Sequence, residues 1–152
     1  MTVTVHVMAE GFEALLERNR LGAFESLWKA SIDWVEQPNV RRGGWSGVGR
    51  LELESVSGDA VAVFVKRQAD HVARSFRHPI RGQLTVVREQ AKIHNARCAG
   101  VPTQEVLYCA ERTHSGSRQG ILITRELEAE PLDSWWESNA ASLEDRWLIV
   151  HK

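Results

Sequence analysis

The sequence predicts an α+β domain in which an antiparallel sheet of about five strands carries one principal helix, with flanking helices at both ends. Two pairs of apolar segments of strand length are each joined by a short turn, and one longer segment between them has helical periodicity. The chain has 152 residues, of which 43% are hydrophobic. This length suits one domain with a single core.

Composition excludes several classes of protein. The 19 basic and 20 acidic residues nearly cancel, so the overall charge does not indicate a nucleic-acid partner. No apolar run approaches the roughly 18 residues of a membrane span, and the start MTVTVHVMAEGF lacks a signal-peptide pattern. The two cysteines, Cys98 and Cys109, lack the spacing of a zinc site. We therefore expect a cytoplasmic protein with reduced thiols, no membrane span and no nucleic-acid partner.

The first 33 residues are expected to form a leading helical segment. Apolar residues recur at helical spacing from Gly11 to Trp34, with an interruption near residues 19–22, which predicts one or two helices. The first strand is expected around Val35–Val40.

A glycine-rich stretch and a hairpin follow. Four of the seven residues from Gly43 to Gly49 are glycine, and we predict a turn that feeds the alternating strand around Leu51 and Leu53. The polar residues Ser57–Asp59 predict a hairpin turn into a buried strand over Ala60–Arg67.

A connector and the principal helix come next. The polar, arginine-rich stretch Gln68–Gly82 is expected to be a loop or a short helix. Gln83–Ala99 is predicted to be a helix that stops before Gly100. One apolar stripe is expected on it, formed by Leu84, Val87, Ala91, His94 and Cys98. His94 on this stripe is interpreted as a core histidine.

The last third of the chain predicts a second hairpin and further helices. Thr103–Arg112 and Gly120–Leu127 have strand length and are separated by a turn at residues 114–117. Beyond Pro131, residues 132–136 and 142–150 have helical patterns.

Two features of this order suit phosphate chemistry. Glycines between strands let backbone N–H groups approach phosphates, although Gly44, Gly47 and Gly49 do not match G-x-G-x-x-G and an ordinary hairpin explains them equally well. Lys66 ends a buried strand and lies at a suitable spacing to pair with Glu89 on the predicted helix. The alternatives are a solvent-facing Lys66, a Glu89 paired with its helix neighbours, and Glu105 as the acid partner.

Together these segments resemble the lipopolysaccharide kinase family, in the Kdo/heptose kinase group that includes InaA-type proteins. The similarity rests on NVRRGGWSGVGR (39–50), VFVK (63–66), REQ (88–90) and ITREL (123–127). It implies a protein-kinase-like amino-terminal lobe over residues 34–127, with residues 128–152 as the hinge exit and the start of a truncated carboxy-terminal lobe. It also implies phosphorylation of a lipopolysaccharide sugar by ATP and Mg²⁺, on the cytoplasmic side of a Gram-negative inner membrane.

The resemblance assigns roles to individual residues. Lys66 would anchor phosphates, Glu89 would orient Lys66, and main-chain groups at Glu126 and Leu127 would form the adenine hinge, although an exposed acidic turn explains that segment as well. The nucleotide would be covered by Gly43, Gly44, Trp45, Ser46, Gly47, Val48 and Gly49. The basic side chains Arg74, Arg77, His78 and Arg81 would contact an anionic sugar or form a solvated loop.

The motifs for catalysis and magnesium binding are not among these 152 residues. No H-x-D catalytic loop or later magnesium aspartate occurs, so the chain alone is expected to be inactive. A non-catalytic binding or stress-response module is the alternative. A carbohydrate-binding domain that uses Trp45, Trp135 and Trp136 is a third interpretation, although core packing also explains these tryptophans.

Overall fold

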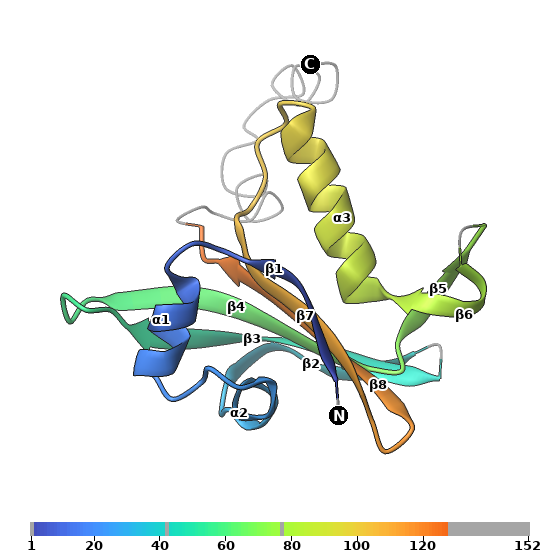
Figure 1. Ribbon diagram of the computed structural model, residues 1–152, viewed down its shortest axis with the longest axis horizontal. Helices are drawn as coiled ribbons and strands as arrows, with labels where there is room; N and C mark the ends of the chain where they lie inside the picture. Colours follow the sequence, from blue (N-terminus) through green and yellow to red (C-terminus); the bar gives the residue numbers. More distant parts are fainter. Residues whose placement is uncertain (1, 42, 77, 128–152) are drawn as a thin grey trace, which may run out of the picture.

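The computed structural model describes residues 2–41, 43–76 and 78–127 (Figure 1). Eight strands and three helices lie in this part of the chain. The strands are β1 (Val3–Met8), β2 (Asp33–Arg41), β3 (Gly44–Glu54), β4 (Ala60–Ala69), β5 (Val72–Ser75), β6 (His78–Leu84), β7 (Val106–His114) and β8 (Ser117–Arg125). The helices are α1 (Phe12–Arg18), α2 (Phe24–Lys29) and α3 (Thr85–Cys98). The helices predicted at 132–136 and 142–150 lie outside the described residues.

Six strands form one antiparallel sheet in the order β1-β7-β8-β4-β3-β2, and β5 pairs with β6 in a separate two-stranded sheet. The predicted α+β class is confirmed, and the arrangement is consistent with the amino-terminal lobe of a kinase-like fold. The sheet has one strand more than expected, because β1 adds to the edge beside β7. The alternation of Val3, Val5 and Val7 is the signal that could have predicted this strand.

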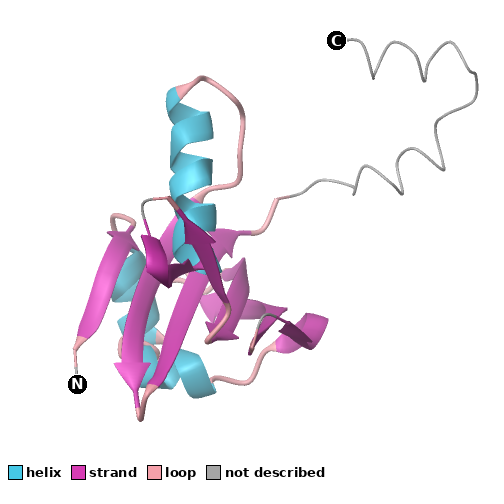
Figure 2. Ribbon diagram, turned by 90° about the vertical axis from the view of Figure 1, so that its right-hand side faces the viewer, coloured by secondary structure: helices cyan, strands magenta, loops and turns pink. Residues whose placement is uncertain are grey.

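The two faces of the large sheet carry different layers. One core cluster joins α1 and α2 to one face and includes Leu16, Leu27, Val63 and Val65. A second cluster joins the start of α3 to the opposite face and includes Val86. Figures 1 and 2 show α3 on the side of the sheet away from α1 and α2. Because side chains alternate along a strand, Lys66 and Gln68 face α3 while Val63 and Val65 face α1 and α2.

The stretch predicted as a loop or short helix, Gln68–Gly82, is instead the end of β4 followed by the β5–β6 hairpin. Asp70 turns the chain with a φ of 54°. Its carboxylate accepts hydrogen bonds from Ser117 Oγ and from the backbone N–H of Arg118, at 2.7 and 2.8 Å. The low apolar content of this segment concealed the hairpin, which packs few side chains.

The principal helix is confirmed, but its predicted apolar stripe is buried only at Leu84 and Val87 and is wrong beyond them. On α3 only Val86 and Val87 are buried, whereas Ala91, His94 and Cys98 are exposed. The helix packs on the sheet through its first turn and then extends away from it (Figure 1). His94 is therefore a surface residue, with Nε2 at 3.6 Å from Cys98 Sγ.

The glycine-rich segment lies mostly within strand β3, and Gly43 is a turn residue just before that strand. Arg41 pairs with Gly44, and Gly43 has a φ of 78°. Position 49 lies within the strand and favours glycine, because a Cβ there would lie 2.6 Å from Ile32 Cδ1. A Cβ on Gly44 would collide with the carbonyl oxygen of Ala69. These glycines serve close packing between strands and layers.

Candidate functional site

The predicted pairing of Lys66 with Glu89 is present. Lys66 Nζ on β4 donates to Glu89 Oε2 on α3 at 2.7 Å, and the two side chains are 27% and 35% exposed. The alternative acid, Glu105, instead binds Arg125 at 2.6 Å. The alternation of side chains along β4 turns Lys66 toward α3, and the helical periodicity of α3 turns Glu89 toward the sheet. The two side chains therefore form this ion pair.

Gln68 fixes the start of the helix that carries Glu89. Its side chain is fully buried, and its Oε1 accepts hydrogen bonds from Thr85 Oγ1 at 2.6 Å and from the backbone N–H of Val86 at 3.1 Å. Gln68 Nε2 donates to the carbonyl of His71 at 3.1 Å. Gln68 thus caps α3 from a neighbouring strand, since Leu84 at the N-cap makes no side-chain bond.

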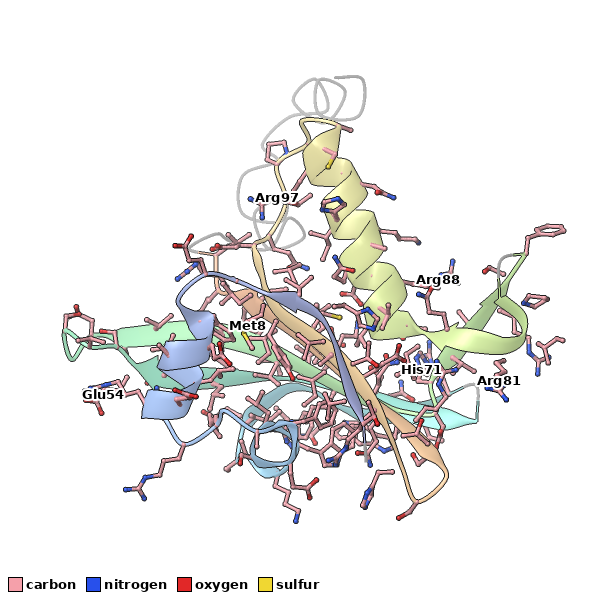
Figure 3. The ribbon with its side chains drawn as sticks, viewed as in Figure 1. Met8, Glu54, His71, Arg81, Arg88 and Arg97 are labelled. Atoms are coloured by element: carbon pink, nitrogen blue, oxygen red, sulfur yellow. The ribbon has the colours of Figure 1, made fainter. Side chains whose placement is uncertain are left out.

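Thr85 extends this network to His71. Thr85 Oγ1 donates its proton to Gln68, so it accepts from His71 Nδ1, which lies 2.9 Å away. Figure 3 shows His71 beside the first turn of α3. Two residues of β4 at positions i and i+2 therefore hold α3: Gln68 at its start and Lys66 one turn further along.

A pocket of about 290 Å³ opens beside the Lys66–Glu89 pair. Its lining comes from β2, β3, β4, β8, α3 and the segment before β7. The lining residues are Val35, Glu36, Val48, Phe64, Lys66, Glu89, Gln104, Leu122 and Thr124. The pocket combines apolar walls with the ammonium of Lys66 and the carboxylates of Glu36 and Glu89, and Lys66 is paired with Glu89.

Most of the residues that line this pocket were not predicted from the sequence. Phe64 pairs with Thr124, and Lys66 pairs with Leu122, so these four side chains share one face of the sheet. Phe64 lies two residues before Lys66 on the same strand, so the alternation of side chains could have predicted that Phe64 lines the pocket. The alignment of β8 with β4 is a tertiary feature that no local pattern carries.

The residues predicted to cover the nucleotide divide between the two faces. Val48 pairs with Lys66 and lines the pocket, and Ser46 shares its face. Trp45 faces the opposite side, where its ring lies 5.4 Å from that of Trp28. Gly47 and Gly49 face the same side as Trp45 and lie against Trp34 and Ile32. Gly43 and Gly44 mark the turn and the start of β3.

The predicted hinge residues lie directly after β8. The backbone N–H of Glu126 donates to the carbonyl of Ala62 at 3.1 Å. Its carboxylate accepts hydrogen bonds from Arg50 Nε and an Nη at 2.8 and 2.9 Å. These bonds to Arg50 lower the pKa of Glu126 and raise the pKa of Arg50. Leu127 is 55% exposed and lines a neighbouring pocket that shares Gln104 with the Lys66 pocket.

The predicted sugar-binding arginines lie apart from this pocket. Arg74 is exposed on β5 and Arg81 is exposed on β6. Arg81 lines a separate cavity of about 820 Å³ with Glu111 and Arg118. Arg77 and the side chain of His78 lie outside the described residues, as do Trp135 and Trp136.

The cysteines and acidic residues provide no metal site within the described residues. Cys98 is exposed and Cys109 is buried, both as free thiols, and burial raises the pKa of Cys109 to about 12. No group of three His, Cys, Asp or Glu side chains in residues 2–41, 43–76 and 78–127 could hold a metal ion. In the same residues, no helix has the length and apolarity to cross a membrane.

Comparison with known proteins links this geometry to one family. The family model described as "Lipopolysaccharide kinase (Kdo/WaaP) family" matches residues 25–147. Protein InaA of Escherichia coli (strain K12) is 32% identical over 120 residues, which cover 78% of this chain and 53% of that protein. The chain therefore spans about half the length of the curated relative it matches. No solved structure is significantly similar.

Proposed function

Because the chain belongs to the lipopolysaccharide kinase (Kdo/WaaP) family, we propose that its Lys66 pocket binds the ATP used to phosphorylate a lipopolysaccharide sugar. The observation that carries this proposal is the 2.7 Å ion pair between Lys66 and Glu89 at a pocket with apolar walls. Glu89 orients the ammonium of Lys66, which then supplies one fixed positive charge to the phosphates.

The walls of the pocket suit the adenine ring. Val35 and Val48 come from one side of the pocket lining and Leu122 from another strand. Aliphatic side chains of this kind pack against a flat heterocycle, while main-chain groups provide the polar contacts. The N–H of Glu126 already donates to Ala62, so the N–H of Leu127 is the proposed donor to adenine.

We propose that these residues bind the nucleotide without transferring its phosphate. The chain supplies Lys66 and Glu89, but its sequence contains no H-x-D motif to orient a sugar hydroxyl. No Mg²⁺ ligand is assigned, because the described acidic side chains form no three-ligand group. When bound, Mg²⁺ would neutralise charge on the phosphates.

Thermal unfolding with and without Mg²⁺-ATP tests this proposal. At a concentration roughly tenfold above the Kd, binding adds about 1.4 kcal/mol of stability, which raises the Tm by about 4 °C in a domain of this size. Lys66→Met is expected to abolish the rise, because it removes the cation that faces the phosphates. Each Tm is compared with that of the same variant without ATP, which separates binding from any loss of stability.

Lys92→Met is the matched control, since Lys92 is an exposed lysine on the same helix as Glu89. It should retain the ATP-dependent rise. No rise for the wild-type chain at millimolar ATP would instead favour a non-catalytic binding module. An equal rise in the Lys66→Met variant would place the nucleotide elsewhere.

A further inference from the structure

The β5–β6 hairpin carries two of the three most exposed large apolar side chains of the described residues. Phe76 is 104% exposed and Ile80 is 84% exposed. Arg74 and Arg81 are exposed on the same hairpin. The hairpin projects beyond the large sheet, beside the start of α3 (Figure 1). The hairpin therefore presents both apolar and basic side chains to the solvent.

The base of the hairpin is anchored without these side chains. Arg118 Nη1 donates to the carbonyls of Arg81 and Gly82 at 3.1 and 3.2 Å. The N–H of Thr85 donates to the carbonyl of His71 at 3.1 Å. These hydrogen bonds use the backbone at the base, and the exposed Phe76 and Ile80 contribute little packing.

The charge of this segment is one-sided. From His71 to Arg88 the sequence contains four arginines and no aspartate or glutamate. The acid that precedes the segment, Asp70, is bound by Ser117 and by the backbone of Arg118. The hairpin is therefore complementary to an anionic surface.

The pairing of apolar and basic residues distinguishes a membrane from a soluble sugar. Arginines alone would suit a phosphorylated sugar, but such a ligand gives no reason to expose Phe76 and Ile80 on the same hairpin. A bilayer surface accommodates both, because apolar side chains enter the boundary between headgroups and acyl chains while arginines pair with lipid phosphates. We propose that the β5–β6 hairpin docks the protein on an anionic lipid bilayer through Phe76, Ile80, Arg74 and Arg81.

Flotation of the full chain with lipid vesicles tests this docking. Wild-type protein is expected to float with vesicles of phosphatidylcholine and phosphatidylglycerol and to bind vesicles of phosphatidylcholine alone much more weakly. The double variant Phe76→Ser/Ile80→Ser should lose about tenfold in affinity, because it removes the apolar insertion. Arg74→Gln/Arg81→Gln should lose about fivefold per arginine, and added salt should weaken wild-type binding.

Matched controls remove similar side chains elsewhere. Val56→Ser/Val101→Ser removes two exposed valines, 88% and 53% exposed. Val56 lies near Glu54, which Figure 3 labels at the opposite end of the sheet. Lys92→Gln/Arg97→Gln removes two charges from the exposed surface of α3. Both control proteins should bind vesicles like the wild type.

Three outcomes would overturn the proposal. Wild-type protein that does not float with anionic vesicles would exclude docking. Unchanged flotation of Phe76→Ser/Ile80→Ser would exclude the hairpin. In a third outcome, the wild-type protein does not float with vesicles and Arg74→Gln/Arg81→Gln weakens binding of glucose 6-phosphate. This result would show that the arginines bind a sugar phosphate. The Lys66→Met variant is expected to float like the wild type. A failure of membrane docking is therefore distinguishable from a failure of nucleotide binding.

Discussion

Lys66 shows how far one residue can be interpreted from sequence. A lysine at the end of a buried strand commonly extends to solvent, and the pattern VFVK alone does not exclude that. The spacing to Glu89 predicted the pair, and the structure has it at 2.7 Å. The prediction succeeded because it needed only the alternation of side chains along one strand and the direction of one side chain on one helix.

The glycines show the opposite case. Their number predicted a turn that leads into a strand and could cover a phosphate, but Gly47 and Gly49 lie inside β3, against Trp34 and Ile32. A glycine needed for close packing and a glycine needed for ligand approach look the same in sequence. The difference depends on neighbours from other elements, which the local sequence does not identify.

The Arg50–Glu126 pair gives a pH-dependent prediction. Hydrogen bonds from Arg50 lower the pKa of Glu126 below its ordinary value of 4.5. A carboxylate with a lowered pKa in the folded state contributes stability above pH 4.5, and this stability is lost as the pH falls through the lowered value. Glu126→Gln should therefore lower the Tm at pH 7, and its difference from the wild type should shrink at acidic pH.

Thermal unfolding across this pH range measures the effect. Glu10→Gln serves as a control, because Glu10 is an exposed acid outside this pair. A Tm difference for Glu126→Gln that stays constant from pH 7 into the acidic range would contradict the role given to Arg50.

At the scale of elements, α3 is positioned by β4. Gln68 caps the start of the helix and Lys66 binds it one turn later. Gln68→Leu preserves the approximate volume but leaves the buried N–H of Val86 and the hydroxyl of Thr85 without this acceptor. The expected loss is about 1–3 kcal/mol of unfolding free energy. A weaker ATP-dependent rise in Tm should accompany it, because Glu89 is no longer held in place.

Chemical denaturation and amide hydrogen exchange test this role of Gln68. Exchange at the first turn of α3 should accelerate in Gln68→Leu and stay unchanged in Gln37→Leu, whose glutamine is exposed on β2. Protection of the Val86 amide equal to that of the wild type would show that Gln68 does not cap α3.

The same helix marks a limit of prediction at this scale. Its range was predicted closely, but only Leu84 and Val87 of the predicted stripe are buried, and Ala91, His94 and Cys98 are exposed. A helical stripe identifies a buried face only where a surface lies opposite it. Since α3 leaves the sheet after its first turn, periodicity overestimated its buried length. The β5–β6 hairpin was missed for a related reason, because it buries few apolar side chains.

At the scale of the whole molecule, the sheet order assembles the pocket. β8 lies beside β4 although β5, β6, α3 and β7 separate them in sequence. This places Leu122 and Thr124 on the same face as Lys66 and Phe64. The hairpins that form the sheet were largely predictable from local patterns, whereas β1 and the order of the hairpins in the sheet were not predicted. The complete list of pocket residues therefore required the fold.

The measurement that tests the central claim most directly is a crystal structure of the chain with Mg²⁺ and a non-hydrolysable ATP analogue. We expect the adenine between Val48 and Leu122, and phosphate oxygens within hydrogen-bonding distance of Lys66 Nζ. Nucleotide bound away from the Lys66 pocket, or a pocket left empty at saturating analogue, would contradict the assignment.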